Sequence, residues 1–147
     1  MYPEGTDAEW FGIDAKGFLA RFTTGGTGPF PKIALTLKLP LFYETNELDI
    51  ICDAKMLVKL PRPDDFSDVS KRGIYGYDWT DVHRSKKDRL EKYELISKPN
   101  TPILYEEIRD YFNESAPVVF FESIEFQSSS SVSPIADIDW AWKNTLV

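Results

Sequence analysis

The sequence predicts a single α+β domain, with a mainly antiparallel sheet of about five or six strands and about two or three helices. Three observations support this fold class. The 147 residues suit one domain spanning residues 1–147. An alternating aromatic pattern opens the chain, and short apolar runs bounded by glycine or proline follow it. Helical periodicity is confined to short segments.

Residues 7–24 carry the clearest local pattern, which is that of a β-hairpin. Residues 14–17 predict its turn, because Asp14 can bond its own backbone and Gly17 accepts a positive φ. The second strand alternates along its length, so that one face carries Phe18, Ala20 and Phe22.

The next segment is ambiguous, and a helix is expected after it. Residues 32–43 show a period of two that indicates a strand, although Pro40 stops it. Residues 47–60 predict a helix, which Thr45 or Asn46 could cap and whose acids come early and lysines late. The proline- and aspartate-rich residues 61–68 then predict a loop.

The second half of the chain predicts three strands and one helix. Residues 73–79, 93–96 and 117–126 read as strands, and residues 105–113 as a short helix. Residues 80–92 are strongly charged and are expected to be solvated.

The C-terminal residues predict a loop followed by a tail that packs back on the domain. Residues 127–134 hold four consecutive serines and are expected to form a flexible polar loop. The tail, residues 135–147, contains two tryptophans whose exposure would be costly.

Charge is unevenly spread along this acidic chain of net charge −7. Residues 100–147 hold 8 acids but only 2 bases. Such a surface repels phosphate backbones, which argues against direct nucleic-acid binding, and it would speed association with a basic partner. A purely solubilising role for the acids remains the alternative.

The N-terminal residues and the single cysteine point to a cytoplasmic protein. The first residues carry neither the basic start nor the apolar stretch of a signal peptide, and no segment has the apolar length of a membrane span. Cys52 follows two isoleucines, so we expect a buried and inert thiol and no internal disulfide. A reducing cytosol is the simplest location.

His83 is the one histidine, and it lies near Asp78 and Asp81. A neutral imidazole beside a carboxylate could act as a general base or bind a metal. A lone histidine is more often structural or exposed, and a zinc site would need nitrogen and sulfur ligands that this chain almost lacks. The sequence therefore predicts no metal, no cofactor and no catalytic residue.

Two other groups of residues could carry chemistry. The loop of Gly25, Gly26, Gly28 and Pro29 looks like a phosphate cradle, but neither a P-loop ending nor a dinucleotide-binding frame accompanies it, so a demanding turn is favoured. Glu122 and Glu125 could pair with Asp137 and Asp139 as acid and base. A solvated acidic face is the favoured interpretation of these four carboxylates.

Two segments of the chain carry a recognisable set of motifs. The first is residues 10–31, and the second is residues 73–83 followed by residues 93–99 and 101–103; together they hold 43 of the 147 residues. The residues that carry the motifs are Trp10, Asp14, Gly17, Gly25, Gly26, Gly28, Pro29, Tyr77, Asp78, Trp79, Asp81 and His83. With these residues, the two segments resemble a family of small, uncharacterised bacterial proteins associated with immunity to polymorphic and contact-dependent-inhibition toxins.

The resemblance implies a protein that binds a cognate toxin, such as a nuclease with a basic surface, and brings no catalytic residues with it. The chain departs from the family from residue 127 onward. The interface is expected in the acidic, aromatic C-terminal third, at Glu122, Glu125, Asp137, Asp139, Trp140 and Trp142. The alternatives are a small-ligand or structural module and, less favoured, a hydrolase that uses His83. The oligomeric state stays open.

Overall fold

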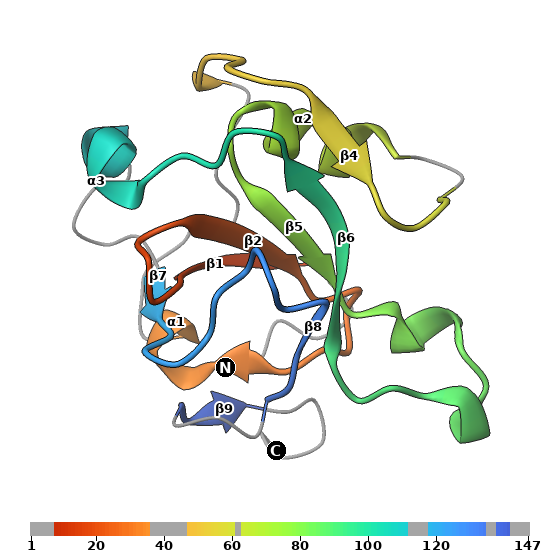
Figure 1. Ribbon diagram of the computed structural model, residues 1–147. Coiled ribbons are helices and arrows are strands. Elements are labelled where there is room, and N and C mark those ends of the chain that lie inside the picture. Colours follow the sequence, from red (N-terminus) through yellow and green to blue (C-terminus); the bar gives the residue numbers. More distant parts are fainter. Residues whose placement is uncertain (1–7, 36–46, 61–62, 112–117, 135–137, 142–147) are drawn as a thin grey trace.

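A mixed β-sheet organises the chain (Figure 1). The computed structural model describes residues 8–35, 47–60, 63–111, 118–134 and 138–141. The strands in these ranges are β1 Glu9–Ile13, β2 Leu19–Thr23, β3 Phe30–Pro31, β4 Ala54–Met56, β5 Tyr75–Asp78, β6 Tyr93–Pro99, β7 Val118–Phe120, β8 Ser131–Val132 and β9 Trp140–Ala141. The α-helices are α1 Lys32–Leu35, α2 Asp64–Lys71 and α3 Tyr105–Ile108, and the 3-10 helices are η2 Thr80–His83, η3 Lys86–Asp88 and η4 Arg109–Tyr111.

The strand order of the main sheet is β4-β6-β5-β2-β1-β7, and β8 joins the outer side of β6. The pairs β1–β2, β4–β6, β5–β6 and β6–β8 are antiparallel, whereas β1–β7 and β2–β5 are parallel. A separate antiparallel pair joins β3 to β9. The predicted single α+β domain is confirmed, with a sheet that is mixed.

The predicted hairpin forms the centre of the sheet. Strands β1 and β2 pair in one unbroken register from Glu9 opposite Thr23 to Ile13 opposite Leu19. Because side chains alternate across a strand, Trp10 and Phe22 point to one face while Phe11 and Leu19 point to the other. Both faces are covered, which explains why four consecutive residues of each strand are buried.

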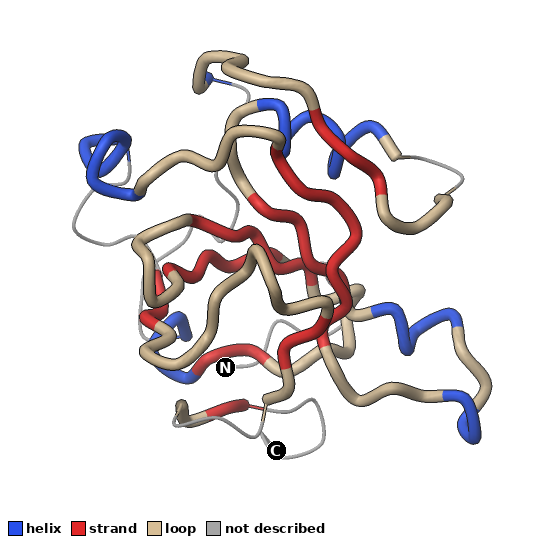
Figure 2. Tube along the Cα trace, viewed as in Figure 1, coloured by secondary structure: helices blue, strands red, loops and turns tan. Residues whose placement is uncertain are grey.

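Two apolar clusters hold the sheet in place. The larger is mainly aromatic and lies between the sheet, β8 and the segment 119–126; its large rings belong to Trp10, Phe22, Phe30, Tyr75, Tyr77, Trp79, Tyr93, Phe121 and Phe126. The smaller lies on the other face and is built from Phe11, Leu19, Val69 and Ile74. Figure 2 shows the helices around the outside of the strands. Helix α2 contacts β4, β5 and β6.

The helix expected over residues 47–60 is wrong. The main regular element in this range is the strand β4, which pairs antiparallel with the last residues of β6, Ala54 lying opposite Pro99. Its side chains alternate between half-buried and exposed, which is the pattern of an edge strand. The capping signals before it were real local preferences, but pairing with a distant strand outweighs local propensity.

The loop expected over residues 61–68 is also wrong from Asp64 onward, because helix α2 occupies Asp64–Lys71. Pro63 stands at the helix N-cap, where its missing N–H costs nothing, and Asp64 and Asp65 favour the positive end of the helix dipole. Phe66 and Val69, three residues apart, face the sheet. The aspartates belong to a helix start and not to a loop.

Other boundaries differ in length. Strand β6 runs on to Pro99, three residues beyond the expected end. Strand β7 stops at Phe120, and the next residues turn across the hairpin instead of continuing to residue 126. The ambiguous segment after the hairpin begins with α1 rather than a strand, and its remainder from residue 36 lies outside the described residues. Within the expected loop 127–134, Ser131–Val132 form β8.

The remaining expectations are met in part. Helix α3 and η4 lie within the helix predicted at 105–113, and Ile108 packs against the smaller cluster. Cys52 is half-buried rather than buried, and its thiol donates to the carbonyl oxygen of Ser70 at 3.3 Å. None of the described helices has the length and apolar character to cross a bilayer.

Candidate functional site

Three of the motif-bearing residues, Trp10, Tyr77 and Trp79, are aromatic residues of the core. Trp10 stacks on Phe22 with ring centroids 4.0 Å apart, and Tyr77 stacks on the same Phe22 ring at 4.9 Å. Trp79 meets Tyr93 edge-on at 5.1 Å. Each such pair contributes roughly 0.5–1.5 kcal/mol beyond the area it buries. These rings hold the fold together and are not available to a ligand.

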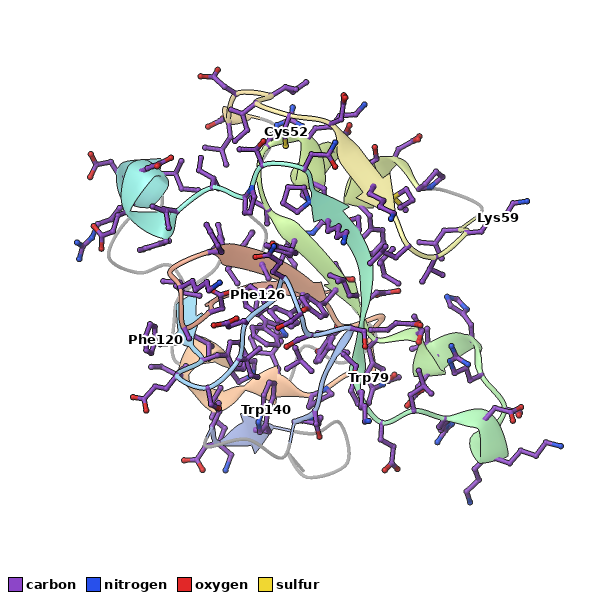
Figure 3. All side chains as sticks on the ribbon, viewed as in Figure 1. Cys52, Lys59, Trp79, Phe120, Phe126 and Trp140 are labelled. Atoms are coloured by element: carbon purple, nitrogen blue, oxygen red, sulfur yellow. The ribbon has the colours of Figure 1, made fainter. Side chains whose placement is uncertain are left out.

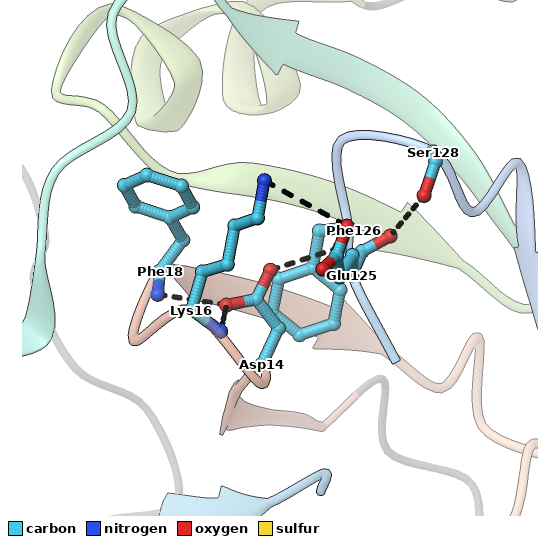
Figure 4. A network of polar contacts seen from close by, with 6 residues as sticks. All are labelled: Asp14, Lys16, Phe18, Glu125, Phe126 and Ser128. Carbon is cyan, nitrogen blue, oxygen red and sulfur yellow. Dashed lines mark hydrogen bonds and ion pairs between the residues drawn. The ribbon is translucent and has the colours of Figure 1, made fainter. Parts of the chain in front are cut away.

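Asp14 is a buried carboxylate that joins two distant segments (Figure 4). Its Oδ1 accepts hydrogen bonds from the N–H groups of Lys16 at 3.0 Å and Phe18 at 2.9 Å, which closes the hairpin turn. Its Oδ2 accepts from the N–H of Phe126 at 2.9 Å. The N–H of Ala15 also donates to the Ile124 carbonyl at 2.9 Å. Asp14 therefore fixes the segment that closes over the aromatic cluster.

The glycine-rich loop is folded around Thr24. The buried Thr24 hydroxyl accepts from the N–H of Ala8 at 3.1 Å and of Gly26 at 3.2 Å. The Thr24 carbonyl accepts from the N–H groups of Thr27 and Gly28 at 3.2 and 2.8 Å. These donors point into the loop itself, whereas a phosphate cradle turns its N–H groups towards the ligand. The expected backbone-demanding turn is the arrangement observed.

Packing explains why glycine occupies this loop. Gly25 and Gly26 have φ values of 60° and 87°, where side chains are disfavoured. A Cβ on Gly28 would lie 2.8 Å from Cγ of Trp79 and 2.9 Å from the Tyr93 hydroxyl. The loop therefore lies directly against the aromatic cluster.

Tyr93 joins this loop to the cluster. The Tyr93 hydroxyl donates to the Pro29 carbonyl at 2.6 Å and accepts from Nε1 of Trp10 at 3.3 Å. The polar ends of both rings are thereby satisfied inside the core, as buried polar groups must be.

The carboxylates near His83 are bound to other groups. Asp78 accepts a 2.6 Å hydrogen bond from the Thr23 hydroxyl. Asp81 is buried, and its two oxygens accept from the N–H groups of Leu90 at 2.7 Å and Glu91 at 2.8 Å. His83 itself is exposed on η2. Asp81 therefore fixes backbone, and Asp78 holds the Thr23 hydroxyl.

The buried phenols are shifted away from ionisation. Burial, followed by the charge of Asp14, raises the pKa of Tyr75 above its usual value. Burial raises the pKa of Tyr77 further, with smaller contributions from Tyr75 and Asp14. The Tyr77 hydroxyl donates to the Ser129 carbonyl at 2.6 Å. Both phenols stay neutral at physiological pH and can only donate or accept hydrogen bonds.

The expected C-terminal interface residues occupy different environments. Glu122 and Asp139 are exposed, while Glu125 is half-buried and its carboxylate lies 3.7 Å from Nζ of Lys16. Trp140 is half-buried in β9 and meets Trp10 edge-on at 5.4 Å, which confirms that this part of the tail packs back. Its Nε1 atom is enclosed without a hydrogen-bond partner among the described residues. Asp137 and Trp142 lie outside the described residues.

Searches against protein-family models, curated proteins and solved structures each return no match. Any function inferred for this chain therefore rests on its own residues. Among the described residues, no group of three or more His, Cys, Asp or Glu side chains is arranged to hold a metal ion.

Phe120 is an exposed aromatic residue that the sequence did not single out. It ends β7 at one edge of the sheet, the residue is 58% exposed, and its side chain points away from the molecule (Figure 3). Its neighbours Val119 and Phe121 are buried on the aromatic side. Residues 118–121 are all apolar, so their pattern does not indicate which side chain faces outward. Only the strand register decides this.

Proposed function

We propose that this chain is an immunity-type protein that binds a cognate bacterial toxin and neutralises it by covering its active site. One observation carries the proposal: an exposed aromatic ring, Phe120, ends an edge strand just before the exposed Glu122. The resemblance of residues 10–31 and 73–83 to toxin-immunity proteins points in the same direction.

Charge supports a basic partner. The chain has a net charge of −7, and residues 100–147 contribute 8 acids against 2 bases. A nuclease toxin must present a basic surface to its substrate, and an acidic protein would be steered towards that surface. The same charge disfavours nucleic acid as the partner of this chain.

The structure favours Phe120 over Trp140 as the aromatic residue that anchors the partner. Trp140 already packs on Trp10. Phe120 is 58% exposed to solvent and would bury most of its ring against a partner. Rings that insert into a partner and are surrounded by polar groups are typical interaction hot spots. We therefore assign the anchor to Phe120, and we keep Glu122, Glu125 and Asp139 as the acidic residues of the proposed interface.

The contacts around His83 and the glycine-rich loop count against a hydrolase that uses His83 and against phosphate binding at this loop. A hydrolase would need a carboxylate to orient His83, but Asp81 accepts from two backbone N–H groups and Asp78 from Thr23. A phosphate-binding module would need outward N–H groups in residues 25–28, and those of Gly26, Thr27 and Gly28 bond to Thr24. We therefore keep binding to a protein, in the cytoplasm of the cell that the toxin attacks, as the proposal.

The test is rescue from a toxin. The toxin candidate is the product of the gene next to the one that encodes this chain, expressed alone and with this chain. Co-expression is expected to restore growth, and the two purified proteins are expected to form a complex. If cells die equally with and without this chain, and the purified proteins do not associate, the proposal is wrong.

A further inference from the structure

The segment from Thr80 to Lys92, here called the β5–β6 loop, projects from the sheet as the η2 and η3 turns (Figures 1 and 2). It connects β5 to β6, and strands β2 and β1 lie between β5 and β7, the strand that carries Phe120. It is therefore separate from the surface proposed above to bind a toxin.

The loop has the opposite charge to the rest of the chain. It contains five bases, Arg84, Lys86, Lys87, Arg89 and Lys92. It contains only three acids, Asp81, Asp88 and Glu91. The remaining residues hold 12 of the 17 Lys and Arg but 21 of the 24 Asp and Glu. All residues from Ser85 to Lys92 are exposed. A basic projection on an acidic protein creates a local field of reversed sign.

Hydrogen bonds hold the loop in one shape. The buried Asp81 carboxylate, at the start of the loop, accepts from the N–H groups of Leu90 and Glu91 on its returning side. The Ser85 hydroxyl donates to the Asp88 carboxylate, and Arg84 lies 3.6 Å from Glu94. The cations of this loop therefore project from a fixed backbone, which lowers the entropy lost on binding.

The shape also stores strain. Glu91 has a φ of 53°, and it is the one non-glycine residue with a positive φ in the described ranges. Such a conformation persists only where the surroundings impose it, and here the Asp81 carboxylate does so. Strained backbone held by a dedicated buried group is found most often at functional positions.

We infer that the β5–β6 loop is a second docking surface, for a protein partner with an acidic patch. Val82 and Leu90 are each more than a third exposed, so the cations are accompanied by apolar contact area. Asp88 and Glu91 interrupt the cations, which would hinder a continuous phosphate backbone but suits the mixed charges of a protein surface. This inference is independent of the proposed toxin binding.

The probe is a biotinylated poly-glutamate peptide, whose binding to the full chain is measured by interferometry at low and at physiological salt. Lys86→Glu with Lys87→Glu is expected to weaken binding about tenfold or more, because two attractions become repulsions. Lys55→Glu with Lys59→Glu is the control, since both lysines are exposed and the charge change is the same. Equal effects of the two double variants, or no binding by the unchanged chain, would overturn the inference.

A second variant separates a shaped surface from mere charge. Asp81→Asn makes the chain less negative but replaces one of the two accepting oxygens by an NH2 donor, so that one of the two N–H groups loses its present acceptor. If only charge matters, the variant should bind the peptide more tightly. If the loop must be held in its shape, the variant should bind more weakly. Thermal unfolding verifies that the variant is folded. Tighter binding would contradict the inference, as would a preference of the unchanged chain for duplex DNA over the peptide.

Discussion

The Asp14 carboxylate holds the backbone of Phe126, 112 residues further along the chain, through a 2.9 Å hydrogen bond. Phe126 is fully buried and touches Phe22, Tyr75, Tyr77 and Phe121. One short acidic side chain therefore links the first turn of the protein to the segment that closes its aromatic cluster.

Replacing Asp14 by alanine should lower the free energy of unfolding by about 2–4 kcal/mol, because the buried N–H of Phe126 loses its acceptor together with those of the turn. Urea denaturation measures the change. Glu122→Ala removes an exposed acid of similar charge and should change stability by less than about 0.5 kcal/mol. Equal stabilities of the two variants would show that Asp14 does not connect these segments.

Gly28→Ala should destabilise the protein by about 1–3 kcal/mol, because the new methyl group overlaps Trp79 and the Tyr93 hydroxyl. Gly17→Ala is the matched control. Its methyl would have ordinary contact, 3.5 Å from Leu104, so only the positive φ of 88° costs energy, about 1 kcal/mol. Thermal unfolding of both variants gives the comparison. A Gly28→Ala variant as stable as the original chain would mean that the loop does not lie against these rings.

Stability should fall at alkaline pH because of Tyr77. Its pKa is raised in the folded state, so the folded protein holds the phenolic proton more tightly than the unfolded chain. The resulting stabilisation is fully present below the unfolded pKa of about 10 and is lost as pH rises above it. Denaturation between neutral and strongly alkaline pH should show this loss. Tyr77→Phe should be less stable at neutral pH, since its bond to Ser129 is gone, and less sensitive to alkali. An identical alkaline loss in both proteins would refute the assignment.

The sequence predicts the parts of this fold that depend on neighbouring residues. The hairpin follows from alternation and from a turn that Asp14 and Gly17 dictate locally. Strand β4 could not be predicted in this way, because its partner is β6, more than 40 residues away, and the nearby capping signals favour a helix. Helix α2 was missed although its signals were local: Pro63, two aspartates and an apolar pair. Charge density was mistaken for loop character.

In the candidate site too, features set by neighbouring residues could be predicted, and those set by distant residues could not. Exposure of Glu122 and Asp139 agrees with a charged sequence pattern. Phe120 could not be singled out, since its exposure depends on the point at which β7 leaves the sheet. The bond between Asp14 and Phe126 and the packing of Trp140 on Trp10 join residues more than 100 positions apart, which no local pattern encodes.

The most direct test of the central claim measures the affinity of this chain for the toxin encoded beside it, with and without changes at the β7 edge. Phe120→Ala and Glu122→Lys should each weaken binding by at least about tenfold, because one removes the anchor and the other reverses the steering charge. Asp65→Lys, an equal charge reversal at an exposed position on α2, should leave binding within about threefold. Undiminished affinity of both β7-edge variants, or equal losses in all three, would contradict the claim.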